Sequence, residues 1–176
     1  MMRSSLFSLA LLVFALGTVS AQDFDAIWTV PFLASPIPLT PVDVDVVDDL
    51  DGDGVADLVV GLVNLPNYSF AGRIEFRSGA TGALISTILA PPMAGTVFGQ
   101  EVLTIDDLNG DGVREVAVGD VVLQTATNQF VVQAWIHDPV TGLLLQTETS
   151  LTGGFGLPAL RLLADPDGDG VRSVAL

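Results

Sequence analysis

The feature that most constrains the fold is an internal repeat. Three segments align without a gap: VDVVDDLDGDGVADLVVG from Val44, VLTIDDLNGDGVREVAVG from Val102, and LRLLADPDGDGVRSVAL from Leu160. Their acidic loops begin at Asp49, Asp107 and Asp165, which are 58 residues apart each time. A fixed period of this length is typical of arrays in which each unit is one small supersecondary structure that buries its faces against its neighbours.

Each unit is predicted to consist of four short strands. Residues 42–47 alternate valine with aspartate, which is the period of a strand, and residues 58–62 form a short β-branched run. Gly79-Ala80-Thr81-Gly82 is a tight-turn signal between two further strands. The expected strands are 42–47, 58–62, 73–76 and 83–89 in the first unit, and 101–105, 116–119, 130–136 and 143–149 in the second.

Four antiparallel strands per unit is the plan of a β-propeller blade, so the predicted fold class is all-β, with about two and a half blades. That number is too small to close a ring of about four to eight blades. We therefore expect a fragment of a longer propeller, or an incomplete ring that further blades or self-association would complete.

The predicted organisation has five segments. Residues 1–21 are typical of a secretory signal peptide, because Arg3 precedes an apolar run and Val19-Ser20-Ala21 fits a small-residue cleavage site. Residues 22–41 form a lead-in, of which 24–30 fit the outer strand of a preceding blade. Residues 42–97 are repeat one, 98–154 repeat two and 155–176 a partial repeat three. We expect a secreted, extracellular or periplasmic protein with no membrane span after the signal peptide.

The charge of the chain limits its partners. There are 21 acidic and 6 basic residues, which gives a net charge of −15, and cysteine is absent. Nucleic acid and anionic lipid require basic contacts, so neither is an expected partner. Cations, neutral sugars and basic protein surfaces fit better. Without disulfides, the loops need another source of stability.

The acidic loops are predicted calcium sites. Counted from the first aspartate, positions one, three, five and nine carry side-chain oxygens in the first two loops, and position seven offers a main-chain carbonyl. Calcium takes about six to eight oxygen ligands, which this spacing supplies. The predicted ligands are Asp49, Asp51, Asp53, Val55 and Asp57 in loop one, Asp107, Asn109, Asp111, Val113 and Glu115 in loop two, and Asp165, Asp167, Asp169 and Val171 in loop three. Ser173 at position nine predicts that loop three is the weakest site.

Two different kinds of metal site, and a plain hairpin turn, fit the acidic loops less well. An EF-hand needs a glutamate at its twelfth position and flanking helices, whereas Val60, Val118 and Leu176 stand there. Transition metals are disfavoured because the chain has no cysteine and one histidine. Asp-Gly pairs often build hairpin turns, but a turn alone does not require acids at four regular positions, and such acids repel one another.

The stretch FGQEVLTIDDLNGDGVREVAVG resembles an FG-GAP repeat, the blade unit of the integrin α-subunit propeller and of many secreted bacterial proteins. The resemblance implies a propeller in which calcium ties two strands of each blade, with a role in binding, adhesion or structure at the cell surface. The ligand would be an unknown protein or carbohydrate. Unit one lacks the Phe-Gly pair, and the usual Gly-Ala-Pro end is replaced by Gly61-Leu62-Val63 and Gly119-Asp120-Val121.

No catalytic residues are predicted. His137-Asp138 precedes Pro139 on an expected turn without a nucleophile, so we expect a surface histidine. GATGALI is also similar to the corner of quinoprotein blades, but it lacks the following tryptophan. Packing roles are expected for the four aromatic residues Trp28, Trp135, Phe98 and Phe155. The alternative functions are a non-catalytic propeller within a larger secreted hydrolase or quinoprotein-like enzyme, and an architectural repeat of a cell envelope.

Overall fold

A computed structural model of the chain describes residues 39–64, 72–92, 94–95, 97–124, 128–150, 159–165, 172 and 174–175. The predicted signal peptide, the lead-in as far as residue 38, Trp28 and Phe155 lie outside these ranges. All regular elements within them are β-strands, which confirms the predicted all-β class. The same ranges contain no helix with the length and hydropathy of a membrane span.

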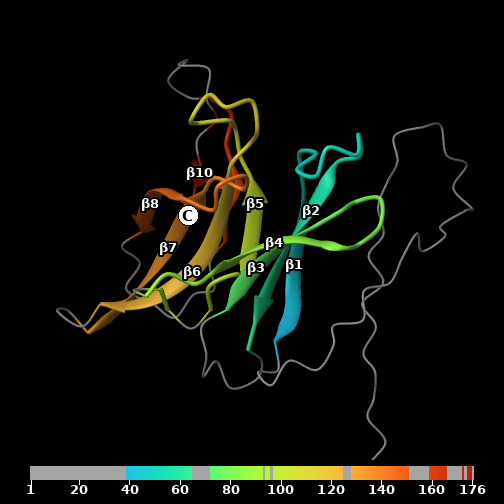
Figure 1. Ribbon diagram of the computed structural model, residues 1–176. Helices are drawn as coiled ribbons and strands as arrows, with labels where there is room; N and C mark the ends of the chain where they lie inside the picture. The colour runs from blue at the N-terminus through green and yellow to red at the C-terminus, as the bar shows by residue number, and fades with distance from the viewer. Residues whose placement is uncertain are drawn as a thin grey trace, which may run out of the picture.

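The strands form two four-stranded sheets and one short ladder (Figure 1). The first sheet contains β1 (Thr40–Val47), β2 (Asp57–Val63), β3 (Arg73–Arg77) and β4 (Leu84–Leu89). The second contains β5 (Glu101–Thr104), β6 (Val116–Gln124), β7 (Gln129–His137) and β8 (Leu144–Ser150). In the partial third repeat, β9 (Arg161–Leu162) pairs with β10 (Val174–Ala175).

Each sheet is a simple antiparallel meander in which strands adjacent in sequence are adjacent in space. The four strands predicted for each of the first two repeats are therefore confirmed. No sheet closes on itself within the described residues. The largest difference is in β6, which continues five residues past its predicted end at Gly119, as far as Gln124. There Val121, Val122 and Leu123 pair with β7, so the apolar run after Asp120 extends the hairpin.

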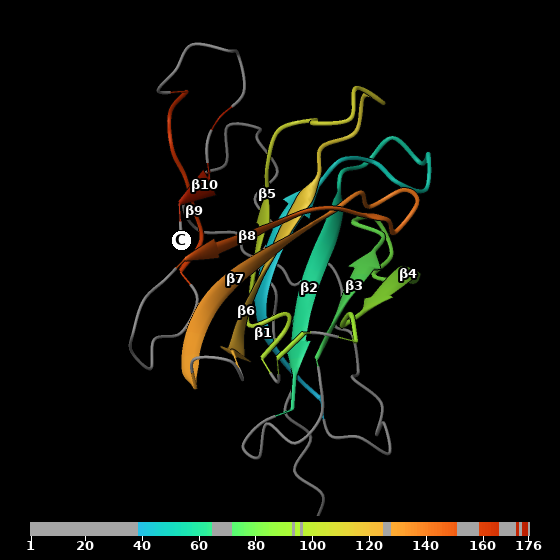
Figure 2. The same cartoon turned by 90° about the vertical axis from the view of Figure 1, so that its left-hand side faces the viewer.

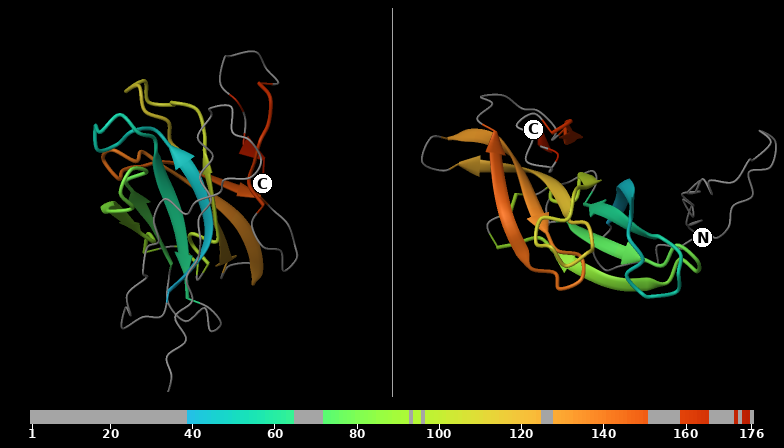
Figure 3. Two further views of the ribbon diagram at one scale, coloured as in Figure 1. Left: turned by 90° about the vertical axis from the view of Figure 1, so that its right-hand side faces the viewer. Right: turned by 90° about the horizontal axis from the view of Figure 1, so that it is seen from above.

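The two four-stranded sheets stack face to face, as the view from above in Figure 3 shows. One buried cluster lies between them, and both sheets contribute to it. It contains Val47, Val59, Ile74, Phe76 and Ile88 from the first sheet, with Phe98, Val102, Val116, Val118 and Trp135 from the second sheet and the segment before it. The packing roles predicted for Phe98 and Trp135 are confirmed.

The second sheet also buries its other face. Ile105, Ala117, Ala134 and Ile136 form a second cluster with Leu160, which directly precedes β9. Because side chains alternate along a strand, Val116 and Val118 of β6 face the first sheet while Ala117 faces the third repeat. The second unit thus buries both of its faces against its neighbours, as the repeat predicts.

The Phe98-Gly99 pair packs tightly against the first sheet. The Phe98 side chain is fully buried, and Gly99 has a φ of +88°, a conformation that favours glycine. A Cβ atom added to Gly61 of β2 would overlap the Gly99 carbonyl oxygen. The pair therefore brings the segment before β5 into direct contact with the backbone of the preceding unit.

The first strands of the two sheets, β1 and β5, lie side by side without forming a ladder. The Asp43 carboxylate accepts the main-chain N–H of Val102 at 2.9 Å, and the Asp45 carboxylate accepts that of Thr104 at 2.7 Å. The Thr104 hydroxyl donates to the Val46 carbonyl at 3.0 Å. The aspartates that alternate with valine in β1 thus bind the next unit, which the alternation alone does not predict.

The prediction of a surface histidine is wrong. His137 is the last residue of β7 and is 3% exposed, and its ring meets that of Phe98 edge-on, with 6.1 Å between the ring centroids. The strand continues up to the turn because the Asp138 carboxylate organises that turn, accepting the N–H groups of Val140 at 2.7 Å and Thr141 at 3.2 Å. The turn begins after His137, so the histidine stays within the core.

Candidate metal centre

Acidic loops one and two lie at the same end of the molecule. Loop one joins β1 to β2 and loop two joins β5 to β6, and Figures 1 and 2 show both loops beyond the same ends of their sheets. Position nine coincides with the start of the outgoing strand. Asp57 is the first residue of β2, and Glu115 directly precedes Val116 of β6. The strands therefore hold position nine rigidly while the other positions lie in the loop.

In both loops the carboxylate at position one binds the loop's own backbone. Asp49 accepts the N–H groups of Gly52 at 2.7 Å and Gly54 at 2.8 Å, and Asp107 binds the glycines of loop two at the same distances. The bond from Gly54 is the main reason why the pKa of Asp49 lies below its usual range. The glycines at positions four and six have φ values of +80° to +90°, which explains the choice of glycine.

Positions three and five continue this local network. In loop one, Asp51 accepts the N–H of Asp53 at 3.2 Å, and Asp53 accepts that of Val55 at 2.8 Å. In loop two, the corresponding bonds to Asn109 and Asp111 are both 2.8 Å long. Side-chain oxygens that bind the backbone two residues later stabilise turns by themselves. The bend of the loop thus has its own hydrogen bonds, to which a cation would add neutralisation of the charge and a link between the loop and position nine.

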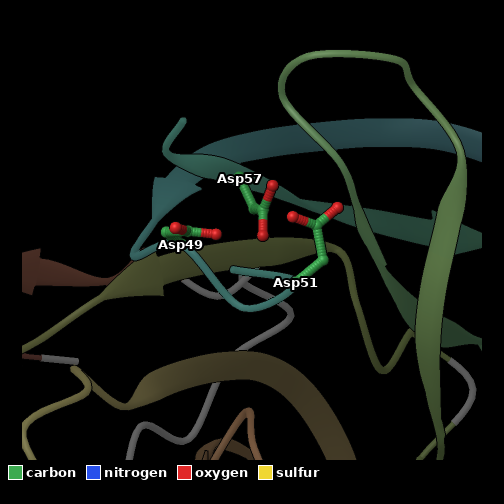
Figure 4. A group of neighbouring side chains, drawn as sticks. All are labelled: Asp49, Asp51 and Asp57. Carbon is green, nitrogen blue, oxygen red and sulfur yellow. The ribbon is translucent and has the colours of Figure 1, made fainter. Parts of the chain in front are cut away.

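Three predicted ligands converge in loop one. Ligand oxygens of Asp49, Asp51 and Asp57 all lie within 4.8 Å of one another, and Figure 4 shows the three carboxyl groups around a common space. Asp57 is fully buried, whereas Asp49 and Asp51 are exposed. Asp53 is not part of this group, and its second oxygen lies 3.5 Å from the Ser78 hydroxyl. Val55 is exposed in the loop, and its counterpart Val113 is half-buried.

The carboxyl groups at position nine differ between the loops. Both oxygens of Asp57 accept a main-chain N–H, one from Leu50 at 2.7 Å and one from Gly79 at 2.9 Å. Gly79 approaches loop one so closely that an added Cβ would overlap the Ala56 carbonyl oxygen. In loop two, Oε2 of Glu115 accepts the N–H of Leu108, the residue that corresponds to Leu50.

The second oxygen of Glu115, Oε1, is buried and has no hydrogen-bond partner among the described residues. In the β7–β8 turn, Pro139 stands at the position that Gly79 occupies in the β3–β4 turn. Proline has no N–H, so it cannot donate to Glu115 as Gly79 donates to Asp57. Burial raises the pKa of Glu115, and the nearby charges of Asp107 and Asp111 raise it further. A buried carboxylate oxygen that also experiences the charges of two further carboxylates is a surrounding that a hard cation would stabilise, so these residues fit calcium.

Loop three is described only in part. Asp165 is half-buried, and the remaining predicted ligands of this loop, Asp167, Asp169 and Val171, lie outside the described residues, as does Ser173. The predicted ranking of loop three below loops one and two stays a prediction.

The ion pairs that join one acidic loop to the next are not predicted from the sequence. Asp48, just before loop one, binds Arg114 of loop two, and Asp106, just before loop two, binds Arg172. The two aspartates are 58 residues apart, and so are the two arginines, so the alignment of the repeats contains a signal for these pairs. The signal is hard to read because the partners of each pair are 66 residues apart in the chain.

No protein-family model matches the sequence. The fold and the loops nevertheless define a class of protein: an all-β repeat protein in which each of the first two units is a four-stranded antiparallel sheet with an acidic loop between its first two strands.

Proposed function

We propose that this chain is an exported calcium-binding module of β-propeller blades related to FG-GAP repeats. The single observation that carries the calcium proposal is the buried carboxyl group at position nine of two consecutive units. Asp57 and Glu115 are both fully buried. Asp57 converges with the exposed Asp49 and Asp51, and the charges of Asp107 and Asp111 act on Glu115. Buried carboxylates stay ionised only when hydrogen bonds or a cation compensate for the lost water.

The donor set favours calcium over other cations. In loops one and two, the side chains at positions one, three, five and nine are carboxylates or an amide. Such hard oxygen ligands bind calcium or magnesium better than zinc or copper. Magnesium demands nearly ideal octahedral geometry, whereas calcium accepts the irregular angles that a short loop with mixed Asp, Asn and Glu ligands provides. The calcium would be structural: it would tie two strands of one unit together and neutralise the loop.

The propeller arrangement is supported by the way the units pack. The second meander packs one face on the first unit and the other on the third repeat, and the first strand of unit one lies beside the first strand of unit two. Propeller blades pack in this manner around a central axis. By analogy with that fold, the module would bind a protein or carbohydrate through its exposed loops, in adhesion or surface recognition.

Calcium binding can be tested by counting ions in native mass spectrometry and by calorimetric titration of protein stripped with chelator. We expect Asp51→Ala to lose the ion of loop one while the fold is kept, because Asp51 is exposed and, among the described residues, accepts one long backbone bond. Glu148→Ala is the matched control, since Glu148 is an exposed carboxylate on β8. It should retain every ion. A wild-type protein that binds no calcium at millimolar concentration would refute the proposal.

A further inference from the structure

Two matching ion pairs connect the acidic loops of neighbouring units, and we call each an inter-loop clamp. In the first, the Asp48 carboxylate accepts the main-chain N–H of Arg114 at 2.8 Å and its side-chain Nε at 3.0 Å. In the second, Asp106 accepts the same two groups of Arg172 at 2.7 and 3.0 Å. A contact that repeats with the array in this detail is a regular part of the interface between units.

Each clamp is attached directly to predicted metal ligands. Asp48 precedes Asp49, which is position one of loop one. Arg114 is position eight of loop two, between the position-seven carbonyl of Val113 and the position-nine carboxylate of Glu115. The first clamp therefore ties the chain at the start of one predicted site to the chain between two ligands of the next.

The geometry of the clamp restrains the main chain as well as the side chains. One oxygen of Asp48 holds the backbone N–H of Arg114, while its second oxygen meets both Nε and Nη2 of the guanidinium, the latter at 2.8 Å. The side chains of Arg114 and Asp48 are 41% and 34% exposed, so charge attraction by itself contributes little. The directional bonds fix where residue 114 lies relative to residue 48, and so fix the two loops relative to each other.

We propose that the clamp between Asp48 and Arg114 couples the two loops, so that calcium at loop one raises the calcium affinity of loop two. Calcium at loop one orders the main chain around Asp49, and the clamp passes this order to the segment that holds Val113 and Glu115. Coupling of two binding equilibria is reciprocal, so calcium at loop two raises the affinity of loop one equally. The inference rests on the proposed calcium function and adds a means of regulating it.

The test follows each loop separately in the full chain by NMR. The amide signals of Gly52 and Gly54 report calcium at loop one, and those of Gly110 and Gly112 report calcium at loop two. We expect Asp51→Ala, which disables loop one, to raise the calcium concentration that half-saturates loop two about fivefold, at the low end of typical couplings because the clamp is partly exposed. With Asp48→Asn already present, adding Asp51→Ala should change that concentration by less than about 1.5-fold.

Asp106→Asn is the matched control for loss of charge, because it removes the same charge beside loop two but leaves the first clamp intact. In that background Asp51→Ala should again shift loop two about fivefold. In calcium-free protein, Asp48→Asn should also speed hydrogen exchange at the Arg114 amide, which loses its charged acceptor.

The outcomes separate the two proposals. Suppose both loops bind calcium, but Asp51→Ala leaves the half-saturating calcium concentration of loop two unchanged, or shifts it equally with Asp48 and with Asn at that position. The coupling is then wrong and the calcium function stands. If neither pair of glycine signals responds to calcium, both proposals are wrong.

Discussion

Replacing the two position-nine carboxyl groups by amides should affect calcium-free protein in opposite ways. Both oxygens of the fully buried Asp57 accept a main-chain N–H, from Leu50 and Gly79. In Asp57→Asn, an amide NH2 group must face one of these donors, so one of the two hydrogen bonds is lost and two donors meet. An unsatisfied buried donor costs about 1–3 kcal/mol, and for a chain of this length that lowers the Tm by about 2–12 °C.

Glu115→Gln meets different surroundings. Its carbonyl oxygen can still accept the N–H of Leu108, while the new NH2 group takes the place of Oε1, which has no partner among the described residues. There the NH2 group carries no negative charge that the charges of Asp107 and Asp111, which raise the pKa of Glu115, would repel. The substitution also removes a buried charge. We expect the Tm of the calcium-free variant to equal or exceed that of the wild-type protein.

The assay is thermal unfolding followed by circular dichroism, first in EGTA and then in millimolar calcium. In calcium, Glu115→Gln should have a lower Tm than the wild-type protein, because it has lost a charged ligand. The decisive observation is that the Tm of Glu115→Gln is at least that of the wild-type protein in EGTA but below it in calcium. If Glu115→Gln in EGTA destabilises the protein as much as Asp57→Asn does, then both oxygens of Glu115 accept hydrogen bonds. The inferred difference between the two position-nine carboxyl groups would then be wrong.

Three further predictions concern calcium, packing and pH. EGTA should lower the Tm of the wild-type protein, since each site saturated about 100-fold above its Kd contributes about 2.7 kcal/mol; an unchanged Tm would argue against structural calcium. Phe98→Ala should cost about 3–5 kcal/mol in urea unfolding because the side chain is fully buried between two units, while Leu89→Ala, 69% exposed, should cost little. Burial lowers the pKa of His137, so the stabilisation present above the unfolded value of about 6.5 is lost as the pH falls below it. Because His137 is the only histidine, His137→Phe should reduce the slope of stability between about pH 7 and pH 5, and an unchanged slope would contradict the assignment.

The strands are predictable because two independent signals coincide. Alternation of valine with aspartate, short β-branched runs and glycine turns mark each strand, and the 58-residue period places the same strands in the next unit. The extension of β6 is not predictable from these signals. By composition Asp120 marks the end of a strand, yet it is fully buried within β6, and its carboxylate accepts the N–H of Gly95 from the segment before β5. Such a partner, 25 residues away, is visible only in the folded chain.

The spacing of the acids predicts which side chains converge better than it predicts how they are held. Asp49, Asp51 and Asp57 come together as expected, because a tight loop brings positions one, three and nine to one side. Spacing does not indicate that Asp53 lies beside Ser78, or that the acids also bind their own backbone. The clamps and the role of Asp43 escape prediction for a shared reason: the partner belongs to another unit, and its distance in space depends on how units stack.

The carboxylates of Asp43 and Asp45 also limit the width of each sheet. The edge of β5 that is not paired with β6 presents main-chain N–H groups, and such an edge can ordinarily pair with another strand. Here two side chains of β1 occupy those donors, at Val102 and Thr104, so no ladder forms across the junction. Eight strands consequently make two separate ribbons of four instead of a single broad one. Units can thus be added by duplication of a gene segment without altering the size of any existing unit, and Asp43→Ala with Asp45→Ala would leave a bare edge prone to fibrous self-association.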